Sequence, residues 1–344
     1  MHAHEPLANT QQARLDALYK QMEPEGLYLL WEKLSALVLP KPDSPAKVRK
    51  WSYDNARDYL MRAGDLISAK QAERPVLILE NPALPGPFGH HAQPVRGPAI
   101  DPPWRGRAGS QAHSVRPARR HRGRERLHLS RRREGGDAAV RPGADARRQW
   151  HDHGNPTDTP MIWLDGLDIP TVRHFDASFA EGYSEDQFPE QAPPGDSVNR
   201  YGRNIRPLKG HTADRRPAHQ PLFHYPYADR RPALDALATS GAEPDPHLGH
   251  ALEFLNPING GPIMATISAH VRLLPSGFET RPRRPTDGTV FVVVEGQGEA
   301  VVEGETIALN PPEILVVPSW KQVVFKAESQ LVLFGYSDKA CQEN

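Results

Sequence analysis

Two histidines one residue apart, His151 and His153, are the residues of this chain whose type and spacing most directly suggest metal chemistry. Side chains alternate along an extended segment, so both imidazoles point to the same face. A neutral imidazole there could bind iron, zinc or copper. The neighbouring Trp150 and Asp152 suggest a half-buried, hydrogen-bonded pocket. Surface or core histidines give the same pattern more often, and one pair cannot fill a coordination sphere, so further ligands must come from elsewhere.

Composition narrows the class of protein. The 344 residues suffice for two domains, and 42 basic residues balance 42 acidic ones. With no net charge, the chain has no overall attraction to nucleic acid or to an anionic membrane. Its one cysteine, Cys341, excludes a disulfide framework and a cysteine-based zinc site, which fits the reducing cytoplasm. No apolar stretch resembles a signal peptide or a membrane span. We therefore expect a cytoplasmic protein with neither nucleic acid nor membrane as a partner.

The elements that must position these residues are mainly strands. Apolar periodicity predicts helices in the first 75 residues, at 10–38 with a break at 24–26 and at 54–63, then a strand at 76–79 and another at 160–165. Residues 189–222 are rich in Pro and Arg and predict an extended linker, followed by a short helix at 231–240. Seven closely spaced strands follow, at 263–274, 290–294, 300–302, 305–309, 314–317, 322–326 and 331–336. Such spacing is typical of a small antiparallel barrel or jelly roll.

The segment from 87 to 148 breaks this order. Arg is very frequent in it, Lys is absent, and no apolar period survives beyond three or four residues. One interpretation is a disordered basic insert that binds nucleic acid. However, an insert of this length in the middle of a well-patterned chain is poorly tolerated by a compact domain.

Reading the segment one base later gives a different interpretation. With suitable synonymous codons, the stretch that begins at Ser110 becomes His-Arg-His-Thr-Gln-Ser-Ala-Leu-Arg-Val-Val-Ile-Glu-Gly. This string alternates as a strand should, and it contains a His-x-His pair. The same shift restores strand-like patterns from Gly89 onward. We therefore predict that the segment is out of frame, opening near Gly86 and closing near Arg148, and that as written it is disordered.

Several motifs resemble gentisate 1,2-dioxygenases and their ring-cleaving relatives that act on salicylate or 1-hydroxy-2-naphthoate. The resemblance covers the whole chain except 87–148, and it rests on residues 30–34, 72–82, 150–155, 163–170, 223–227, 255–257 and 286–289. It implies a mainly β bicupin, that is, two double-stranded β-helix barrels, with an N-terminal helical region. The predicted parts are a helical region at 1–75, a first barrel at 76–188, a linker with a short helix at 189–260, a second barrel at 261–338 and a tail at 339–344.

The resemblance also implies one Fe(II) held by three histidines of the first barrel. His151 matches the third ligand, because it follows the family's Trp and stands four residues before Asn155. The other two ligands fall at Ser110 and Ala112, where the shifted frame restores histidine. His113 is out of register by one residue, which turns a strand side chain to the opposite face. As written, the chain is therefore expected to bind iron weakly or not at all.

The implied reaction opens the ring of gentisate with O2 and gives maleylpyruvate. Three histidines leave positions on iron for a substrate that chelates through its carboxylate and ortho-hydroxyl, and for dioxygen. By resemblance Arg74 pairs with the substrate carboxylate, and a second arginine is expected where the chain has Ala118. His153 and Asp165 match positions that contact substrate or orient ligands. Taken without the family, Arg74 fits a surface ion pair and Asp165 fits a turn.

The second barrel provides an internal comparison. Aligning residues 292–296 with the restored strand places Arg283 and Pro285 at the first two ligand positions and Val323 at the third. These side chains bind no metal, so this barrel is expected to pack against the first and to form subunit contacts. The resemblance suggests a homotetramer.

Two hypotheses therefore remain. In the first, the encoded protein is an iron dioxygenase and 87–148 is a reading error. In the second, the frameshift is real and the chain is a damaged, non-catalytic bicupin, because the loss of several core strands exceeds the roughly 5–15 kcal/mol that stabilises a domain. If the chain is active, salicylate and 1-hydroxy-2-naphthoate are the alternative substrates.

Overall fold

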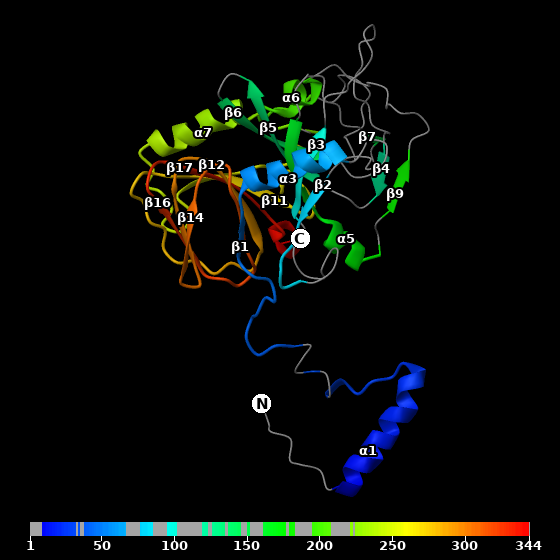
Figure 1. The fold of residues 1–344 in the computed structure, drawn as a ribbon. Coiled ribbons are helices and arrows are strands. Elements are labelled where there is room, and N and C mark those ends of the chain that lie inside the picture. Colours follow the sequence, from blue (N-terminus) through cyan, green and yellow to red (C-terminus); the bar gives the residue numbers. More distant parts are fainter. Residues whose placement is uncertain are drawn as a thin grey trace. The chain divides into compact units, whose positions relative to one another are not determined.

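The computed structural model describes residues 9–31, 34, 38–66, 76–84, 95–101, 119–122, 126–134, 137–145, 150–151, 161–176, 179–182, 195–207, 221–222 and 224–343. The chain forms two units, residues 1–43 and residues 44–344. Figure 1 labels their elements. Unit 1 contains helix α1 (Asn9–Met22) and a short 3-10 helix, η1 (Glu23–Glu25). Gly26 ends η1 in the left-handed conformation, at φ 70°, which confirms the break predicted at 24–26.

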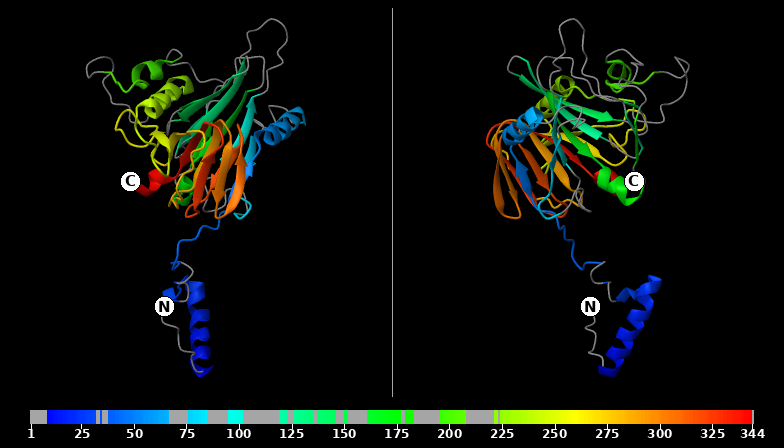
Figure 2. Two further views of the ribbon diagram at one scale, coloured as in Figure 1. Left: turned by 90° about the vertical axis from the view of Figure 1, so that its left-hand side faces the viewer. Right: turned by 45° about the vertical axis from the view of Figure 1, so that its right-hand side comes forward.

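Most of the second barrel lies in the C-terminal third of unit 2. A three-stranded sheet has the order β14-β13-β16, and a six-stranded sheet has the order β1-β15-β12-β17-β11-β10. Figure 2 shows β11 to β17 as one group in yellow to red. The bounds are β1 (Arg49–Trp51), β10 (His250–Glu253), β11 (Ser268–Leu274), β12 (Thr289–Glu295), β13 (Gly298–Val302), β14 (Glu305–Leu309), β15 (Ile314–Val317), β16 (Val323–Ala327) and β17 (Leu331–Ser337).

The burial of these strands follows from their sequences. β13 and β16 alternate buried and half-buried residues, as expected where one face lines a core and the other meets solvent. β17 is buried at every position, because its two faces contribute to two different clusters of buried apolar side chains. All seven strands predicted for this region are present. The predicted start at residue 263 was wrong, because residues 263–266 bend, Met264 N–H donates to the Ile267 carbonyl, and the strand begins at Ser268.

The first barrel has a five-stranded sheet in the order β2-β3-β8-β5-β6 and a three-stranded sheet in the order β7-β4-β9. The bounds are β2 (Val76–Leu79), β3 (Val95–Asp101), β4 (Arg119–Arg122), β5 (Arg126–Glu134), β6 (Asp137–Asp145), β7 (Trp150–His151), β8 (Met161–Leu167) and β9 (Phe179–Gly182). The strands predicted at 76–79 and 160–165 are present as β2 and β8.

Strands β3 to β6 lie in the segment that the sequence predicts to be out of frame and disordered. Their backbones pair as antiparallel strands, with β5 between β6 and β8. Backbone pairing does not distinguish one reading frame from another, so the frameshift stays a prediction. Between these strands, residues 87–94, 102–118, 123–125, 135–136 and 146–148 lie outside the described part of the chain.

Helices lie beside both barrels. The bounds are α3 (Tyr53–Leu66), α5 (Ile169–His174), α6 (Asp196–Tyr201), α7 (Tyr227–Thr239) and α8 (Lys339–Glu343). α3 contacts β2 and β3 of the first barrel, whereas α7 contacts β6 of the first barrel and also β10 and β11 of the second. The predicted linker thus contains α6 and α7, and the predicted tail forms α8. Among the helices described, none has the length and apolar character needed to cross a membrane.

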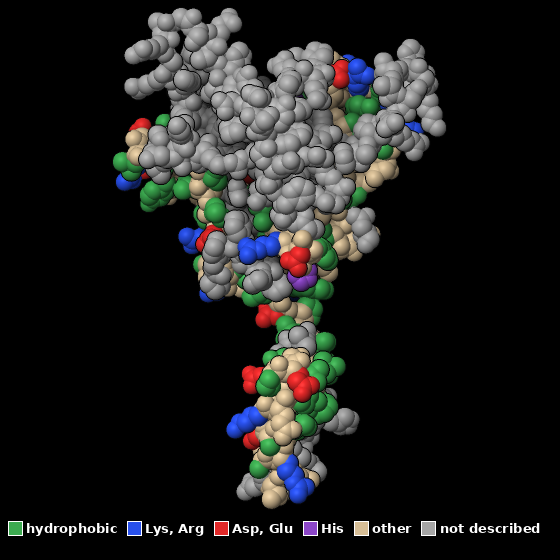
Figure 3. Space-filling view, turned by 90° about the vertical axis from the view of Figure 1, so that its right-hand side faces the viewer, with side chains coloured by type: hydrophobic (Ala, Val, Ile, Leu, Met, Phe, Trp, Pro, Cys, Tyr) green, Lys and Arg blue, Asp and Glu red, His purple; other side chains and the backbone are tan. Residues whose placement is uncertain are grey.

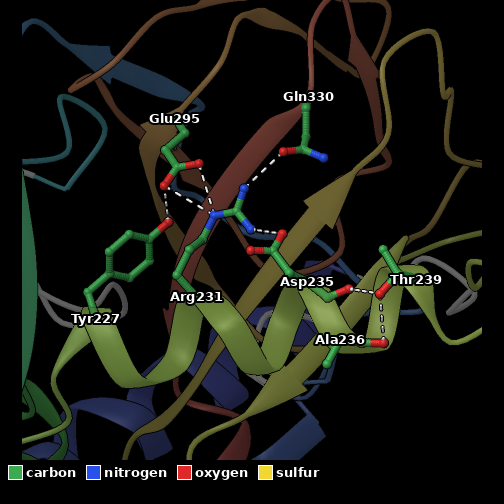
Figure 4. Close-up of polar contacts among 7 residues, drawn as sticks. All are labelled: Tyr227, Arg231, Asp235, Ala236, Thr239, Glu295 and Gln330. Carbon is green, nitrogen blue, oxygen red and sulfur yellow. Dashed lines mark hydrogen bonds and ion pairs between the residues drawn. The ribbon is translucent and has the colours of Figure 1, made fainter.

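A polar cluster fixes α7 to the second barrel. Arg231 on α7 pairs with Glu295 at the end of β12, at 3.0 Å from Nε to Oε2, and its Nη2 donates a hydrogen bond to Gln330 at 2.9 Å. Arg231 also pairs with Asp235 one turn along α7. The Tyr227 hydroxyl donates to Glu295 at 2.5 Å. Figure 4 shows Arg231 at the centre of these contacts. Burial, followed by the hydrogen bond to Glu295, raises the pKa of Tyr227 well above its usual value, so the phenol stays protonated.

Candidate functional site

Strand β8 carries Asp165 into the middle of the first barrel's larger sheet. It lies between β3 and β5, and its register places Asp165 opposite Arg96 and His128. Asp165 is 1% exposed, and its neighbours Leu164 and Leu167 are buried as well. A carboxylate buried to this degree is costly unless polar partners surround it. The position is therefore interior, which does not fit the interpretation of Asp165 as an exposed turn residue.

β8 is also a contact between the two barrels. Gly166 packs against the ring of Tyr336 on β17 so closely that a Cβ there would lie 2.6 Å from Tyr336 Cε2. Leu164 belongs to the same buried apolar cluster as Phe334 and Tyr336 of the second barrel. One residue after β8, Asp168 accepts a hydrogen bond from Thr266 Oγ1 at 2.7 Å. The segment around Asp165 is thus held in place by the second barrel.

Tyr336 is a site neighbour that the sequence did not identify. Its side chain is 1% exposed, and its hydroxyl has no hydrogen-bond partner among the residues that the structure describes. Burial raises the pKa of Tyr336 well above its usual value, and the charge of Asp165 raises it further. The phenol is therefore a neutral donor close to the Asp165 carboxylate. Nothing in the local pattern at 331–337, a continuous apolar strand, indicates this proximity.

The structure describes the backbone of His151 in the short strand β7. This strand pairs with β4 so that His151 lies opposite Arg119, and β4 pairs in turn with β9. Arg74, Ser110, Ala112, Ala118 and His153 all lie outside the described residues. Of the predicted site residues, the structure therefore places Asp165 and the backbone of His151, and the predicted ligand set stays a prediction.

In the second barrel, two of the positions that align with iron ligands face each other. Arg283 and Val323 form an antiparallel bridge, with hydrogen bonds of 3.0 Å from Arg283 N–H to the Val323 carbonyl and 2.8 Å in the other direction. Two metal ligands on neighbouring strands would have to lie opposite each other, as these two residues do. The side chains at these positions, guanidinium and isopropyl, supply no metal donor.

The ligand positions that the resemblance implies do not supply three metal donors. The ligand positions implied by the resemblance hold one imidazole, a hydroxyl and a methyl group, at His151, Ser110 and Ala112. A single imidazole does not provide the donor set of a non-haem iron centre. Within the described part of the chain, no group of three or more His, Cys, Asp or Glu side chains could hold a metal.

Comparison with known proteins relates the chain to aromatic dioxygenases. No family model matches it. Among curated proteins, gentisate 1,2-dioxygenase 1 of Aquipseudomonas alcaligenes is 38% identical, with 94% of this chain and 92% of that protein covered. 5-Aminosalicylate 1,2-dioxygenase of a Comamonas species is 30% identical, with coverages of 95% and 87%. The structure of salicylate 1,2-dioxygenase from Pseudoaminobacter salicylatoxidans, in its adducts with gentisate, matches with a TM-score of 0.83 and 29% identity, over 99% of this chain and 93% of that one.

Proposed function

Because the chain belongs to the gentisate 1,2-dioxygenase family, we propose that its gene encodes an oxidoreductase that opens the ring of gentisate with both atoms of O2 and gives maleylpyruvate. The observation that supports this most is the 38% identity to a gentisate 1,2-dioxygenase over 94% of the chain. The bicupin fold, shared with a salicylate 1,2-dioxygenase that forms adducts with gentisate, supports the same reaction. The substrate is then a small aromatic hydroxy acid, and the second substrate is dioxygen.

We assign roles to four residues of this chain on the basis of the family pattern. Arg74 would pair with the substrate carboxylate, because a planar guanidinium matches a carboxylate with two hydrogen bonds. His151 would be the one ligand left of three for Fe(II), the ion that would supply the oxygen chemistry of the intact site. His153 would contact the substrate or a ligand. Asp165 would orient these groups, a role that its 1% exposure supports, since a buried carboxylate on a strand is held in one place.

We propose further that the polypeptide as written does not perform the reaction, because residues 87–148 are out of frame. Support comes from the sequence: the shifted frame restores histidine at 110 and 112 and a strand pattern around them, whereas the written segment has neither. If the frameshift is present in the gene, the protein that the gene encodes is the damaged, non-catalytic bicupin. Resequencing the DNA from codon 80 to codon 155 distinguishes a gene defect from a recording error.

The experiment that tests the function uses a frame-restored chain, obtained by reading the coding DNA one base later between codons 86 and 148. With Fe(II), this chain should consume one O2 per gentisate and form a ring-opened product. Replacing Arg74 by Met in it should raise KM for gentisate at least tenfold, because the carboxylate loses its charged partner. No oxygen uptake with any aromatic hydroxy acid would overturn the proposal.

Salicylates and 1-hydroxy-2-naphthoate are the alternative substrates, and the same assay tests them. One curated relative is named 5-aminosalicylate 1,2-dioxygenase, and another, 30% identical over 56% of this chain, is named 1-hydroxy-2-naphthoate 1,2-dioxygenase. A panel of gentisate, salicylate, 5-aminosalicylate and 1-hydroxy-2-naphthoate compares kcat/KM directly. Gentisate should give the highest value.

We also propose that the chain acts in the cytoplasm as a homo-oligomer, a tetramer by family. Unit 1 exposes more than half of each of four apolar side chains, Leu27, Tyr28, Leu30 and Trp31, and hydrophobic side chains gather on one side of this unit (Figure 3). An apolar surface of this kind supports a subunit contact. Light scattering of the frame-restored chain measures the oligomer, and a monomer would contradict it.

A further inference from the structure

The interior of the second barrel contains a row of buried polar side chains, each with one polar atom that has no hydrogen-bond partner among the described residues. Ser268, His270 and Arg272 alternate along β11, so all three point to the same face of that strand. This is the barrel face, because His270 and Arg272 both contact Phe291, whose neighbours in the buried cluster are Leu331 and Leu333. The other face of β11, with Ala269 and Val271, packs in the apolar cluster that the two barrels share.

Each member of the row has a polar atom with no hydrogen-bond partner among the described residues. These atoms are Ser268 Oγ, His270 Nε2 and Arg272 Nε, and each is fully shielded. Ser268 is 3% exposed and Arg272 is 5% exposed. Buried polar atoms are paired in the great majority of cases, so three in succession on one strand point to a missing group.

Arg272 is the most unusual of the three. Its guanidinium lies 5.1 Å from the centroid of the Phe291 ring, and no carboxylate in the described part of the chain lies within ion-pair distance of it. Burial, followed by the charge of Arg283, lowers the pKa of Arg272 to about 9, and the charges of Asp287 and Asp245 act in the opposite direction. Asp287 instead accepts a hydrogen bond from Thr289 at 3.1 Å. A buried guanidinium that lacks an ion pair is destabilising, so an anion bound here would stabilise the folded state.

The surroundings carry positive charge. The groups whose charges act on His270 are Arg272, Arg283 and Lys339, and together with burial they lower its pKa well below the usual value. His270 is therefore neutral and can donate one N–H. Its ring packs against Gly335, where an added Cβ would lie 2.4 Å from Nε2.

From this geometry we propose that the second barrel binds a small oxyanion, a carboxylate or an inorganic phosphate, between Ser268, His270 and Arg272. The guanidinium offers two parallel donors to such an anion, and the hydroxyl and imidazole add two more. The site is separate from the first barrel and does not depend on iron or on ring cleavage. It gives the second barrel a ligand of its own.

Thermal unfolding of the full-length chain tests this proposal. Acetate and phosphate, each compared with chloride at equal ionic strength, should raise the unfolding midpoint in a saturable way, because a ligand that binds only the folded state stabilises it. Gentisate forms a third arm, which reports whether an aromatic carboxylate also fits. A larger rise with acetate than with phosphate would identify a carboxylate site, and the reverse would identify a phosphate site.

Substitutions of Arg272 test whether the anions raise the unfolding midpoint by binding at this row. Arg272→Met should remove the rise and weaken binding at least tenfold by titration calorimetry, while in chloride alone its midpoint should equal or exceed that of the unsubstituted chain, because an unpaired buried charge is gone. Arg272→Lys should bind with intermediate affinity, since it retains the charge and loses the paired donors. The control Arg281→Met removes an exposed arginine of the same barrel and should leave the rise unchanged. Equal rises in Arg272→Met and the unsubstituted chain, or no binding at any anion concentration, would mean that water alone fills the row and would overturn the proposal.

Discussion

Gly166 is a residue at which the two barrels approach each other closely. An added Cβ would lie 2.6 Å and 2.8 Å from two carbon atoms of the Tyr336 ring, which is buried and cannot move aside freely. Gly166→Ala should therefore lower the free energy of unfolding by about 1–3 kcal/mol, the usual cost of overpacking a core. Urea denaturation followed by tryptophan fluorescence measures this change.

Gly64 provides the matched control for that substitution. It lies in α3, and an added Cβ would meet no atom within 4 Å. Gly64→Ala should be neutral or stabilise the protein by up to about 1 kcal/mol, because alanine is the better helix former. If both variants behave alike, the tight contact between Gly166 and Tyr336 does not exist in solution.

Asp338 makes stability depend on pH. Burial raises the pKa of Asp338 to about 6, although its carboxylate accepts a hydrogen bond from Gly288 N–H at 2.9 Å. The folded protein therefore holds this proton more tightly than the unfolded chain does. Its contribution is complete below about pH 4, the pKa of an unfolded carboxyl, and is lost as the pH rises through about 6.

Asp338→Asn should remove this dependence, because the amide oxygen still accepts from Gly288 and carries no charge. Relative to the unsubstituted chain, the variant should gain roughly 2 kcal/mol between pH 4.5 and pH 7.5. Free energies of unfolding measured across that range, with exposed Asp229→Asn as the control, report the difference. A difference that stays constant with pH would show that Asp338 ionises normally.

At the scale of elements, Arg231 is the centre of the polar cluster that fixes α7 to the second barrel. Arg231 is 18% exposed and pairs with both Glu295 and Asp235, so the cluster is partly shielded from water. Arg231→Met keeps the aliphatic stem and removes the pairs, and it should cost about 1–2 kcal/mol of unfolding free energy. The control is Arg200→Met in α6, which breaks a 2.8 Å pair with Asp196 at a site 44% exposed and should cost less than about 0.5 kcal/mol. Equal losses would show that α7 is not fixed by this cluster.

The elements that the sequence predicted well are those whose pattern is local. The strands from 290 to 336 alternate or run apolar between Gly and Pro turns, and they were found within one or two residues. β1 and β10 were missed, because three or four residues carry too little pattern and both strands are stabilised by pairing with distant partners, β15 and β11. α8 was missed for the same reason of length.

The site was predictable only in part. His151 and Asp165 were found through motifs, and the structure places Asp165 in the interior. Tyr336 and the row Ser268, His270 and Arg272 were not found, because what distinguishes them is burial and the lack of partners within a fold. Those properties follow from packing between segments far apart in the chain, and no spacing in the sequence reports them.

At the scale of the whole molecule, the two barrels carry different parts of the function. The first barrel would hold the reaction, and the second supports it by packing Tyr336 and Phe334 against β8. The family relationship extends over 94% of the chain and the structural likeness over 99%, whereas the proposed defect is confined to 87–148. We therefore propose that the chain has lost two iron ligands and has kept the fold of its family.

Iron content per chain tests that claim most directly. The written polypeptide and the frame-restored chain are purified side by side, loaded anaerobically with Fe(II), desalted and analysed by mass spectrometry for metal. The restored chain should retain close to one iron per chain and consume O2 with gentisate, and the written chain should retain less than about a tenth of that, because one imidazole does not compete with water for the ion. Stoichiometric iron and gentisate-dependent oxygen uptake by the written chain would contradict the account.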